Sequence, residues 1–359
     1  MYEKRIGNVL GEMKKRGLSQ LVVSDPMAIW YLTGIGIEPY ERLYALLLRE
    51  DGKHALFLNL MFGERETDIG KVWYTDTDDP VALVAERVDP AKPLGVDKDW
   101  PARFLVPLMD RFPGLEVRLG SDCVDDVRAC KDETEQALMR RASEINDKAC
   151  ARAAASLRVG DTEKEVADRI RSYYKEEGSE EPSFTLIVSF GDHAADPHHE
   201  PDDTKLKPGD CVLFDIGCKW KRYCSDMTRT YFCRKADPKY AAIHDLVRSA
   251  NEKAESMIRP GVKLCELDKA ARDLITEAGY GKYFTHRLGH FIGVTDHEKG
   301  DVSLTTPLVA KEGMIFSIEP GVYLPGEFGV RVEDLVLVTK DGFERLNHLD
   351  KHWSLVGCE

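Results

Sequence analysis

Residues 1 to about 128 alternate between apolar stretches of helical and of extended character. Apolar residues recur at helical spacing in Tyr2–Arg16, and the continuous run Leu21–Val23 is typical of a buried strand. The apolar runs on either side of Asp51-Gly52 predict a hairpin, because Asp-Gly favours a tight turn. Further strands and helices are expected at Val72–Tyr74, Pro80–Val88, Leu94–Val96, Pro101–Phe112 and Leu115–Leu119. This order predicts a layered α/β domain, without a catalytic constellation of its own.

The pattern changes after Ser121, where a short polar connection leads into a long amphipathic helix over Glu133–Leu157. We therefore predict two domains, residues 1–128 and residues 129–359. The second contains an internal repeat, because the segments that begin at Leu157 and Ile258 align without gaps at an offset of 101 residues. Each segment is a turn glycine followed by an amphipathic helix and a β-rich stretch with histidines. The repeat indicates two related α/β halves around a shared cleft, with a chance likeness of two helices as the alternative.

A polar segment, Lys219–Arg222, separates two apolar, β-rich runs within Cys211–Phe232 and predicts an antiparallel hairpin. Asp215 and Asp226 interrupt these runs. With a two-residue turn at Trp220-Lys221, the two aspartates would lie directly opposite each other, with Cβ atoms about 5 Å apart. Like charges in that position are destabilising unless a cation lies between them. The hairpin is thus either a divalent-cation site or a strand pair with two unrelated aspartates.

The last third of the chain repeats this arrangement around Pro325-Gly326-Glu327, a tight turn between two more β-rich runs. Glu319 and Glu333 are equidistant from Gly326 and are therefore expected to face each other on neighbouring strands. Arg331 points to the same face as Glu333, because side chains alternate along a strand, and it could orient that carboxylate. A second facing pair of carboxylates favours a metal site over surface decoration.

Histidines lie between and before the two hairpins. The segment HRLGHFIGVTDHE contains His286, His290 and His297, and DPHHEP contains His198 and His199. The glycines in the first segment favour a turn and a strand over a zinc-binding helix. Singly, such histidines are usually structural, but four carboxylates with one or two histidines are the ligand mix of a hydrolytic two-metal site. Oxygen-rich ligation favours manganese, with cobalt or zinc as alternatives.

Composition and charge exclude several classes of partner and reaction. A formal net charge of -13 argues against nucleic acid and anionic membranes, since both require a basic face. No apolar run approaches the roughly 18 residues of a membrane span, and the N-terminal segment lacks the apolar block of a signal peptide. Nine cysteines without a CxxC pair indicate the reduced thiols of a cytoplasmic protein. Serine-hydrolase and P-loop chemistry are not expected, because GxSxG and GxxxxGK[ST] are absent.

Together these motifs resemble the pita-bread metallopeptidases, in the branch of aminopeptidase P, Xaa-Pro dipeptidase (prolidase) and creatinase. The resemblance spans essentially the whole chain. It implies an α+β protein in which a small creatinase-like α/β domain precedes a duplicated catalytic domain with a curved sheet covered by helices. The family's five metal ligands match Asp215 in FDIG, Asp226 in SDMTRT, His290 in GHFIG, Glu319 in IEPG and Glu333 in RVED. Further active-site positions of the family match His198, His286, His297 and Arg331.

The resemblance also implies a mechanism. Two divalent cations would be bridged by Asp226 and Glu333, with Asp215 on one ion and His290 and Glu319 on the other. A hydroxide held between the ions would attack the scissile carbonyl of an X–Pro bond in a proline-containing di- or short peptide. Glu319 would be the proton shuttle, taking a proton from the water and passing it to the leaving nitrogen.

Roles for other residues follow from the same resemblance. His297, with His198, would hydrogen-bond the developing oxyanion or the substrate amide. The family is usually homodimeric, so that Tyr40 or Arg42 of one subunit would border the active site of the other. Many prolidases have a Pro-Arg pair after the His-Glu motif that grips the C-terminal carboxylate of a dipeptide, whereas this chain has Lys299-Gly300. Lys299 could substitute for that arginine, and dipeptidase and aminopeptidase both stay open.

Two other functions are compatible with such a fold. One is a creatinase-like amidinohydrolase, which works without metal, and the other is a non-catalytic peptide-binding relative. Retention of all five ligand positions argues against both. The acidic segment around Asp192 and Asp196 has no role that the sequence assigns.

Overall fold

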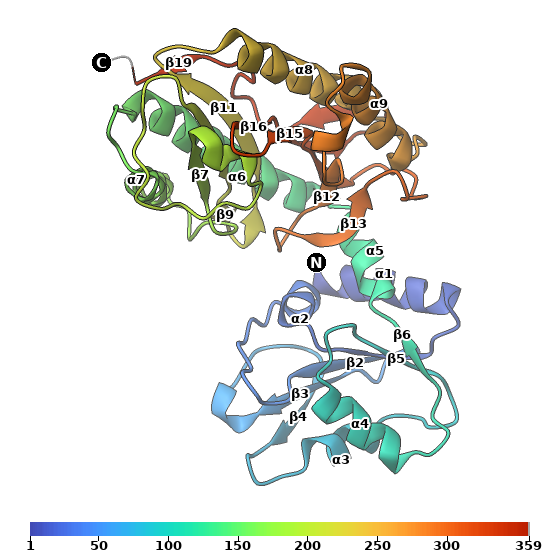
Figure 1. The fold of residues 1–359 in the computed structure, drawn as a ribbon. Helices are drawn as coiled ribbons and strands as arrows, with labels where there is room; N and C mark the ends of the chain where they lie inside the picture. The colour runs from blue at the N-terminus through green and yellow to red at the C-terminus, as the bar shows by residue number, and fades with distance from the viewer. Residues whose placement is uncertain (358–359) are drawn as a thin grey trace. The chain divides into compact units, whose positions relative to one another are not determined.

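The computed structural model describes residues 1–357, which divide into two compact units, Met1–Arg128 and the remainder from Ala129 onwards (Figure 1). The first unit is a three-layer α/β/α domain around a six-stranded sheet. The strand order is β4 (Gly70–Tyr74), β3 (Ala55–Asn59), β2 (Ala45–Arg49), β1 (Gln20–Val23), β5 (Leu94–Val96) and β6 (Val117–Leu119). The hairpin at Asp51-Gly52 is confirmed, because β2 and β3 pair antiparallel on either side of it.

Alternating side chains of β1 explain the layers of the first unit. Leu21 and Val23 enter one core with helices α1 (Tyr2–Lys15) and α2 (Pro26–Thr33). Val22 enters the opposite core with α3 (Pro80–Ala85) and α4 (Ala102–Arg111). A strand buried on both faces is apolar at every position, which is why Leu21–Val23 shows no alternation in the sequence. A short 3-10 turn, η1 (Leu60–Phe62), follows β3.

The segment predicted as a polar connection after Ser121 is instead a helix, α5 (Asp122–Ala129). Cys123 and Val124 are buried in the same core as α1 and α2. Two aspartates in the first turn also favour the helix, since negative charge is stabilising at a helix N-terminus. Tertiary packing of a few apolar residues therefore makes this aspartate-rich segment helical.

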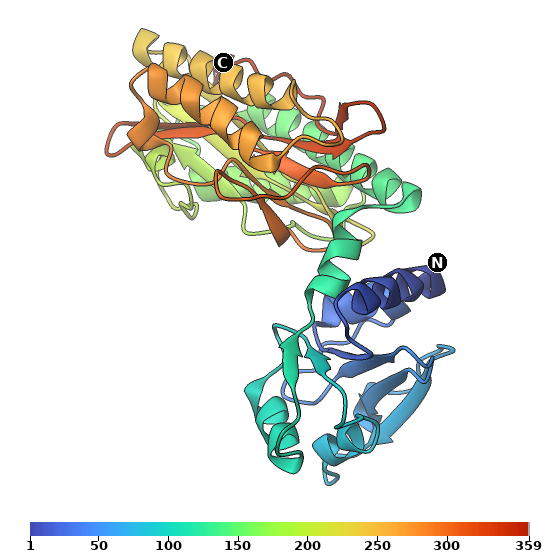
Figure 2. The same cartoon turned by 90° about the vertical axis from the view of Figure 1, so that its right-hand side faces the viewer.

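The second unit consists of two halves with the same order of elements (Figures 1 and 2). The first half contains α6 (Glu133–Ser156), α7 (Glu163–Glu176), β7 (Ile187–Phe190), β8 (Cys211–Ile216) and β11 (Met227–Cys233). The second half contains α8 (Pro238–Glu255), α9 (Leu264–Glu277), β12 (Gly289–Phe291), β14 (Ile315–Ile318) and β17 (Asp334–Val338). Figure 2 shows α8 and α9 side by side along one face of the strands. The duplication predicted from the repeat is thus present in the fold.

The strands of the second unit form two main sheets and two short ribbons. The sheets have the orders β19-β11-β8-β7 and β13-β12-β14-β17-β18, and the ribbons are β9 with β10 and β15 with β16. The remaining strands and 3-10 turns are η2 (Gly191–Ala195), β9 (Lys219–Trp220), β10 (Tyr223–Cys224), η3 (Gly281–Tyr283), β13 (Glu298–Val302), β15 (Gly321–Leu324), β16 (Phe328–Arg331), β18 (Phe343–Arg345) and β19 (Leu355–Val356). Except for the parallel pair of β11 and β19, the named strand pairs of this unit are antiparallel.

Candidate active site

A cavity of about 700 Å³ lies in the second unit and is lined by residues of both halves. Its volume is within the range of roughly 300–1,000 Å³ that is usual for sites of small ligands. The lining includes all nine residues singled out by the sequence, namely His198, Asp215, Asp226, His286, His290, His297, Glu319, Arg331 and Glu333. The cavity is therefore the candidate active site.

The hairpin that carries Asp215 and Asp226 has a different turn from the predicted one. Its turn is Lys221-Arg222, one position later than Trp220-Lys221. Both turn residues have positive φ, 48° and 71°, as in the type I′ turns whose twist matches that of a hairpin. Asp215 consequently pairs with Thr228, and the prediction that the two aspartates lie directly opposite each other is wrong. The shift amounts to two residues, so both aspartates still project from the same face.

The second pair of carboxylates has the predicted register. β15 and β16 pair around the turn at Gly326, and β14 pairs with β17 in the same register, with Ile318 opposite Asp334. Glu319 and Glu333 lie between these two ladders, at positions that face each other across the hairpin. The expected strand in HRLGHFIG is also confirmed, because β12 carries His290.

The buried ends of these carboxylates converge on His290. One ligand atom each of Asp226, His290 and Glu333 lies within 4.8 Å of the others. His290 Nε2 is 3.5 Å from Asp226 Oδ2 and 3.5 Å from Glu319 Oε1. Within residues 1–357, the buried atoms Asp215 Oδ1, Asp226 Oδ1 and Glu333 Oε1 have no hydrogen-bond partner. Since buried charges are paired or coordinate metals, this donor set fits divalent cations that prefer oxygen with some imidazole nitrogen.

Side chains from each half hold a carboxylate of the other half. Arg331, from the second half, forms an ion pair with Asp215 and donates from Nε to Thr228 Oγ1 at 3.0 Å. Thr228, from the first half, donates from Oγ1 to Glu333 Oε2 at 2.7 Å. Arg331 also donates from Nη1 to Tyr323 Oη at 2.7 Å. The sequence argument missed Thr228 and Tyr323, although Thr228 gives a signal as a polar residue within an apolar strand.

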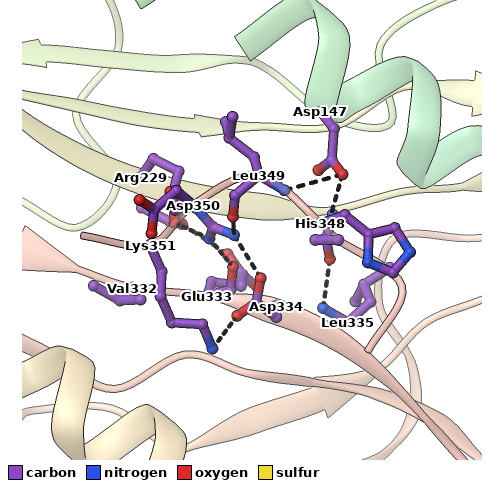
Figure 3. A network of polar contacts seen from close by, with 12 residues as sticks. Asp147, Arg229, Val332, Glu333, Asp334, Leu335, His348, Leu349, Asp350 and Lys351 are labelled. Atoms are coloured by element: carbon purple, nitrogen blue, oxygen red, sulfur yellow. Dashed lines mark hydrogen bonds and ion pairs between the residues drawn. The ribbon is translucent and has the colours of Figure 1, made fainter. Parts of the chain in front are cut away.

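A buried network of ion pairs lies behind Glu333 (Figure 3). The carboxylate of Asp334 pairs through Oδ1 with Arg229 Nη2 at 2.7 Å and through Oδ2 with Lys351 Nζ at 2.6 Å. Arg229 also donates from Nη1 to the carbonyl oxygen of Glu333 at 2.7 Å. Lys351 donates to Asn251 Oδ1 at 2.6 Å. Removal of one member would leave another charge buried and unpaired, which is strongly destabilising. Through the hydrogen bond from Arg229, this network holds the backbone at Glu333 in place.

Burial changes the acid–base properties of the cluster. It raises the pKa of Asp226 well above the usual range, and the neighbouring charge of Asp215 raises it further. Burial, together with the charge of Asp226, also raises the pKa of Glu333 well above its usual range. Burial raises the pKa of Glu319 to about 7, against the opposing effect of nearby positive groups. A bound cation acts in the other direction, because it favours the ionised carboxylates.

Three histidines surround the carboxylate cluster in different environments. His286 Nε2 lies 2.9 Å from Tyr323 Oη, and burial beside an arginine lowers the pKa of this histidine to about 3. The ring of His297 meets the ring of His290 edge-on at 4.1 Å between centroids, while 58% of the His297 side chain is exposed. His198 lines the cavity from the loop that follows η2. His286 is thus a fixed neutral group, whereas His297 and His198 are exposed residues of the cavity wall.

A cavity floored by buried carboxylates and one imidazole, and braced between two related halves, defines a metal-dependent hydrolase. The chain belongs to metallopeptidase family M24, whose model matches residues 137–340. The creatinase/prolidase N-terminal domain matches residues 5–130. The protein is a metallopeptidase, as the resemblance implied.

Relatives match along nearly the whole chain. An uncharacterised peptidase of Staphylococcus aureus (strain bovine RF122 / ET3-1) is 37% identical over 354 residues, covering 97% of this chain and 99% of the relative. The structure of dipeptidase PepE from Mycobacterium ulcerans is 34% identical, with a TM-score of 0.94, and covers 99% of this chain and 98% of that one. A recombinant prolidase from Thermococcus sibiricus is 31% identical, with a TM-score of 0.92, and covers 99% of both chains. These similarities confirm the expected fold class, a creatinase-like domain followed by a duplicated pita-bread domain.

None of the described helices combines the length and the apolar character that crossing a membrane requires.

Proposed function

We propose that this metallopeptidase cleaves the X–Pro bond of dipeptides and short peptides and depends on two divalent cations, preferentially Mn²⁺. The observation that carries the proposal is the set of buried carboxylate oxygens without donors, on Asp215, Asp226 and Glu333. With Glu319 the cluster has four carboxylates, and Arg331 offsets one of their charges. The remaining negative charge exceeds what one divalent ion neutralises, which favours two ions.

The proposed ligands divide between the two ions. Asp226 and Glu333 would be the shared ligands, in keeping with ligand atoms that lie within 4.8 Å of each other and of His290. Asp215 would hold one ion, and His290 and Glu319 the other, in keeping with the 3.5 Å between His290 Nε2 and Glu319 Oε1. When bound, the ions supply an acidified water molecule and polarise the scissile carbonyl. Oxygen-rich ligation favours Mn²⁺, and Co²⁺ or Zn²⁺ also suit carboxylate and imidazole ligands.

Glu319 is the proposed proton carrier. Its Oε1 accepts a hydrogen bond from Ser317 Oγ at 3.1 Å, and the same hydroxyl accepts from the backbone N–H of His290 at 3.0 Å. These contacts fix the Glu319 carboxylate at the cavity wall. From this position the carboxylate would take a proton from water and return it to the leaving nitrogen.

Groups on the rim of the cavity are proposed to bind the peptide. His297 and His198 would donate N–H groups to the oxyanion or to the substrate amide. His286 and Arg331, joined through a tyrosine hydroxyl, would keep the wall beside the metal ligands rigid. The proline nitrogen of an X–Pro bond has no N–H, so selectivity must come from the shape of the ring.

Arg287 is the proposed grip for the C-terminal carboxylate of a dipeptide. Arg287 lines the cavity, whereas Lys299 is not among the described residues that line it. Arg287 also forms an ion pair with Asp301, and about 37% of its side chain is exposed. A guanidinium group can pair with Asp301 along one edge and bind the substrate carboxylate with another. An ammonium group has no such planar fork and suits this position less well.

We also propose a homodimer in a cytoplasmic setting. Tyr40 is 76% exposed, so its ring is available to a partner subunit. Arg42 is held by two hydrogen bonds to Asp76, at 2.9 and 2.8 Å, and is the weaker candidate. Light scattering after size exclusion should give twice the chain mass of 40.5 kDa, and a mass of one chain would contradict the dimer.

The activity is tested with X–Pro dipeptides and X–Pro–Y tripeptides before chelation, after chelation and after return of Mn²⁺. We expect hydrolysis that disappears on chelation and returns with Mn²⁺. Activity on creatine without metal would show a creatinase-like enzyme, and absence of metal binding would show a non-catalytic relative. Either result would overturn the proposal.

A further inference from the structure

The start of α7 contains a second group of metal-ligating side chains, apart from the carboxylate cluster. Glu163, the first residue of this helix, is completely buried. Its Oε1 lies 3.1 Å from His193 Nδ1, and its Oε2 lies 2.7 Å from His199 Nε2. Asp202 completes the group, and one ligand atom of each residue lies within 4.8 Å of the others. We call these four residues the histidine cluster.

Among the described residues, no lysine or arginine forms an ion pair with the carboxylates of the histidine cluster. Within the described chain, the ion pairs of Glu163 are with His193 and His199 only. The carboxylate also accepts the backbone N–H groups of Phe190, at 2.8 Å, and Asp202, at 3.1 Å. The Glu163 carboxylate is completely buried, and a buried charge is paired or coordinates a metal.

In the second half of the unit, a comparable buried carboxylate is paired with an arginine. Asp268 in α9 is also fully buried, and it accepts the backbone N–H of Leu288 at 3.0 Å. Its charge is balanced by Arg272, which donates two hydrogen bonds at 2.7 and 3.0 Å. In the first half, the side chains that face the buried carboxylate are imidazoles, which are also the commonest protein ligands of metal ions.

We propose that Glu163, His193, His199 and Asp202 bind a transition-metal ion of the Zn²⁺ or Co²⁺ type, at a site distinct from the carboxylate cluster. Two imidazoles with two carboxylates form a donor set that suits these ions. Ligand atoms around a tetrahedral Zn²⁺ are about 3.3 Å apart, close to the spacings of 2.7 and 3.1 Å in the histidine cluster. On binding, each imidazole would release the proton that it donates to Glu163 and bind the ion through that nitrogen, keeping a proton on its other nitrogen. The hydrogen bonds from backbone N–H groups to Glu163 would stay in place.

The ion would act as a clamp on the loop that joins β7 to β8. The cluster takes His193, His199 and Asp202 from this loop, and His199 lines the cavity together with its neighbour His198. The acidic segment that the sequence left without a role, around Asp192 and Asp196, belongs to the same loop. Its negative charge favours a cation here.

The test measures bound metal in the full-length protein. Wild type and the double variant H193N/H199N are stripped with a chelator, loaded with Zn²⁺, dialysed and analysed by mass spectrometry of the metal. We expect the double variant to retain one Zn²⁺ per chain fewer than the wild type. H352N, which removes an exposed imidazole elsewhere, should keep the wild-type number. Equal Zn²⁺ content in wild type and double variant would overturn the proposal.

A second measurement separates this site from the carboxylate cluster. In D226N/E333Q, whose proposed metal ligands are disabled, one Co²⁺ should still bind and give visible absorption of a nitrogen-containing site. Adding E163Q should abolish that absorption while the circular dichroism stays that of the folded protein. Failure of D226N/E333Q to bind Co²⁺ would overturn the histidine cluster and leave the proposed peptidase activity untouched. If D226N/E333Q does not fold, the comparison of Zn²⁺ content decides alone.

Discussion

The two halves of the catalytic unit share a scaffold and attach different side chains to it. In the first half, Asn146 of α6 donates to the carbonyl oxygen of Ile216, and in the second half, Asn251 of α8 donates to that of Ile318, both at 2.7 Å. The carboxylates next to these strand ends are aspartates in the first half and glutamates in the second. The difference follows from position, since Asp215 lies within a ladder whereas Glu319 and its partner lie between two ladders.

The halves are also braced against each other at the site. Arg331 of the second half holds Asp215 of the first, and Thr228 of the first half holds Glu333 of the second. Asp215 and Glu333 are therefore each oriented by a side chain of the other half. Duplication provides the scaffold, and the contacts that cross between the halves provide the site.

Replacing a shared ligand should have the largest effect. D226N removes the negative charge of the carboxylate proposed to hold both ions, and we expect kcat to fall by at least roughly 10³-fold with loss of bound Mn²⁺. Metal analysis and X–Pro hydrolysis measure the two effects. D296N is the matched control, because Asp296 lines the cavity outside the proposed ligand set, and it should keep both Mn²⁺ ions. Near-normal turnover in D226N would show that the site is misplaced.

Weakening the contact of Arg331 with Asp215 should have the second largest effect. R331K keeps the charge beside Asp215 but loses the fork that also reaches Thr228 and Tyr323. We expect a loss of about 10- to 100-fold in activity or Mn²⁺ affinity, as is usual for residues that orient metal ligands. Isothermal titration with Mn²⁺ and steady-state kinetics measure both quantities. Wild-type values for both would mean that the arginine fork orients nothing.

The contact of Thr228 with Glu333 should contribute less, since it is a single hydrogen bond from a hydroxyl group. T228V removes the hydrogen bond to Glu333 Oε2, and we expect about tenfold weaker Mn²⁺ binding. T230V is the matched control, because Thr230 is buried on the same strand and donates to the carbonyl oxygen of Arg331 instead. Both variants should lose about 1 kcal/mol of stability, and only T228V should lose metal affinity. Equal Mn²⁺ affinity in T228V and T230V would show that the hydrogen bond from Thr228 to Glu333 does not support metal binding.

The halves also differ in what they offer the substrate. Arg287 belongs to the second half, and R287M should raise KM for X–Pro dipeptides by about tenfold, since it removes one charged hydrogen-bond partner. The KM for dipeptides with an amidated C-terminus should stay within about twofold. Equal changes for free and amidated substrates would exclude Arg287 as the carboxylate grip.

A further difference between the halves concerns stability at acidic pH. His244 in α8 lies seven residues before Asn251, where the first half has Met139 seven residues before Asn146, and both are fully buried. Burial lowers the pKa of His244 to about 3. Because the unfolded histidine has a pKa of about 6.5, the unfolded state gains a proton first, and stability falls as the pH decreases from 6.5 towards 3. At pH 5 this amounts to about 2 kcal/mol relative to neutral pH.

H244M copies the first half and should remove this part of the pH dependence. Urea unfolding at pH 7.5 and at pH 5 measures it as the difference between the two variants. An equal loss of stability in wild type and H244M over this interval would contradict a buried neutral His244.

The sequence predicts the parts of the site that depend on spacing along the chain. Glu319 and Glu333 were placed correctly because one tight turn sets their register. Asp215 and Asp226 were placed on the correct face but in the wrong register, because two non-glycine residues, Lys221 and Arg222, adopt positive φ. A pattern of apolar residues indicates which face of a strand is buried. It does not indicate which residues of the turn adopt positive φ.

Contacts between distant segments were beyond the sequence argument. Arg331 reaches Thr228 and Tyr323 from another segment, and Lys351 reaches Asp334 from a segment near the end of the described chain. Such contacts depend on how the two halves pack, which periodicity does not encode. The nine cavity residues came from spacing together with the family resemblance, whereas the residues that brace them came from the structure.

The central claim is that carboxylates from both halves together hold two catalytic cations. Its most direct test is a titration of the metal-free enzyme with Mn²⁺, in which bound metal and hydrolysis of an X–Pro dipeptide are followed together. Activity should reach its plateau only after the second Mn²⁺ per chain has bound, and D226N should show neither the binding nor the activity. Full activity in the metal-free enzyme, or two bound ions that leave X–Pro dipeptides intact, would contradict it.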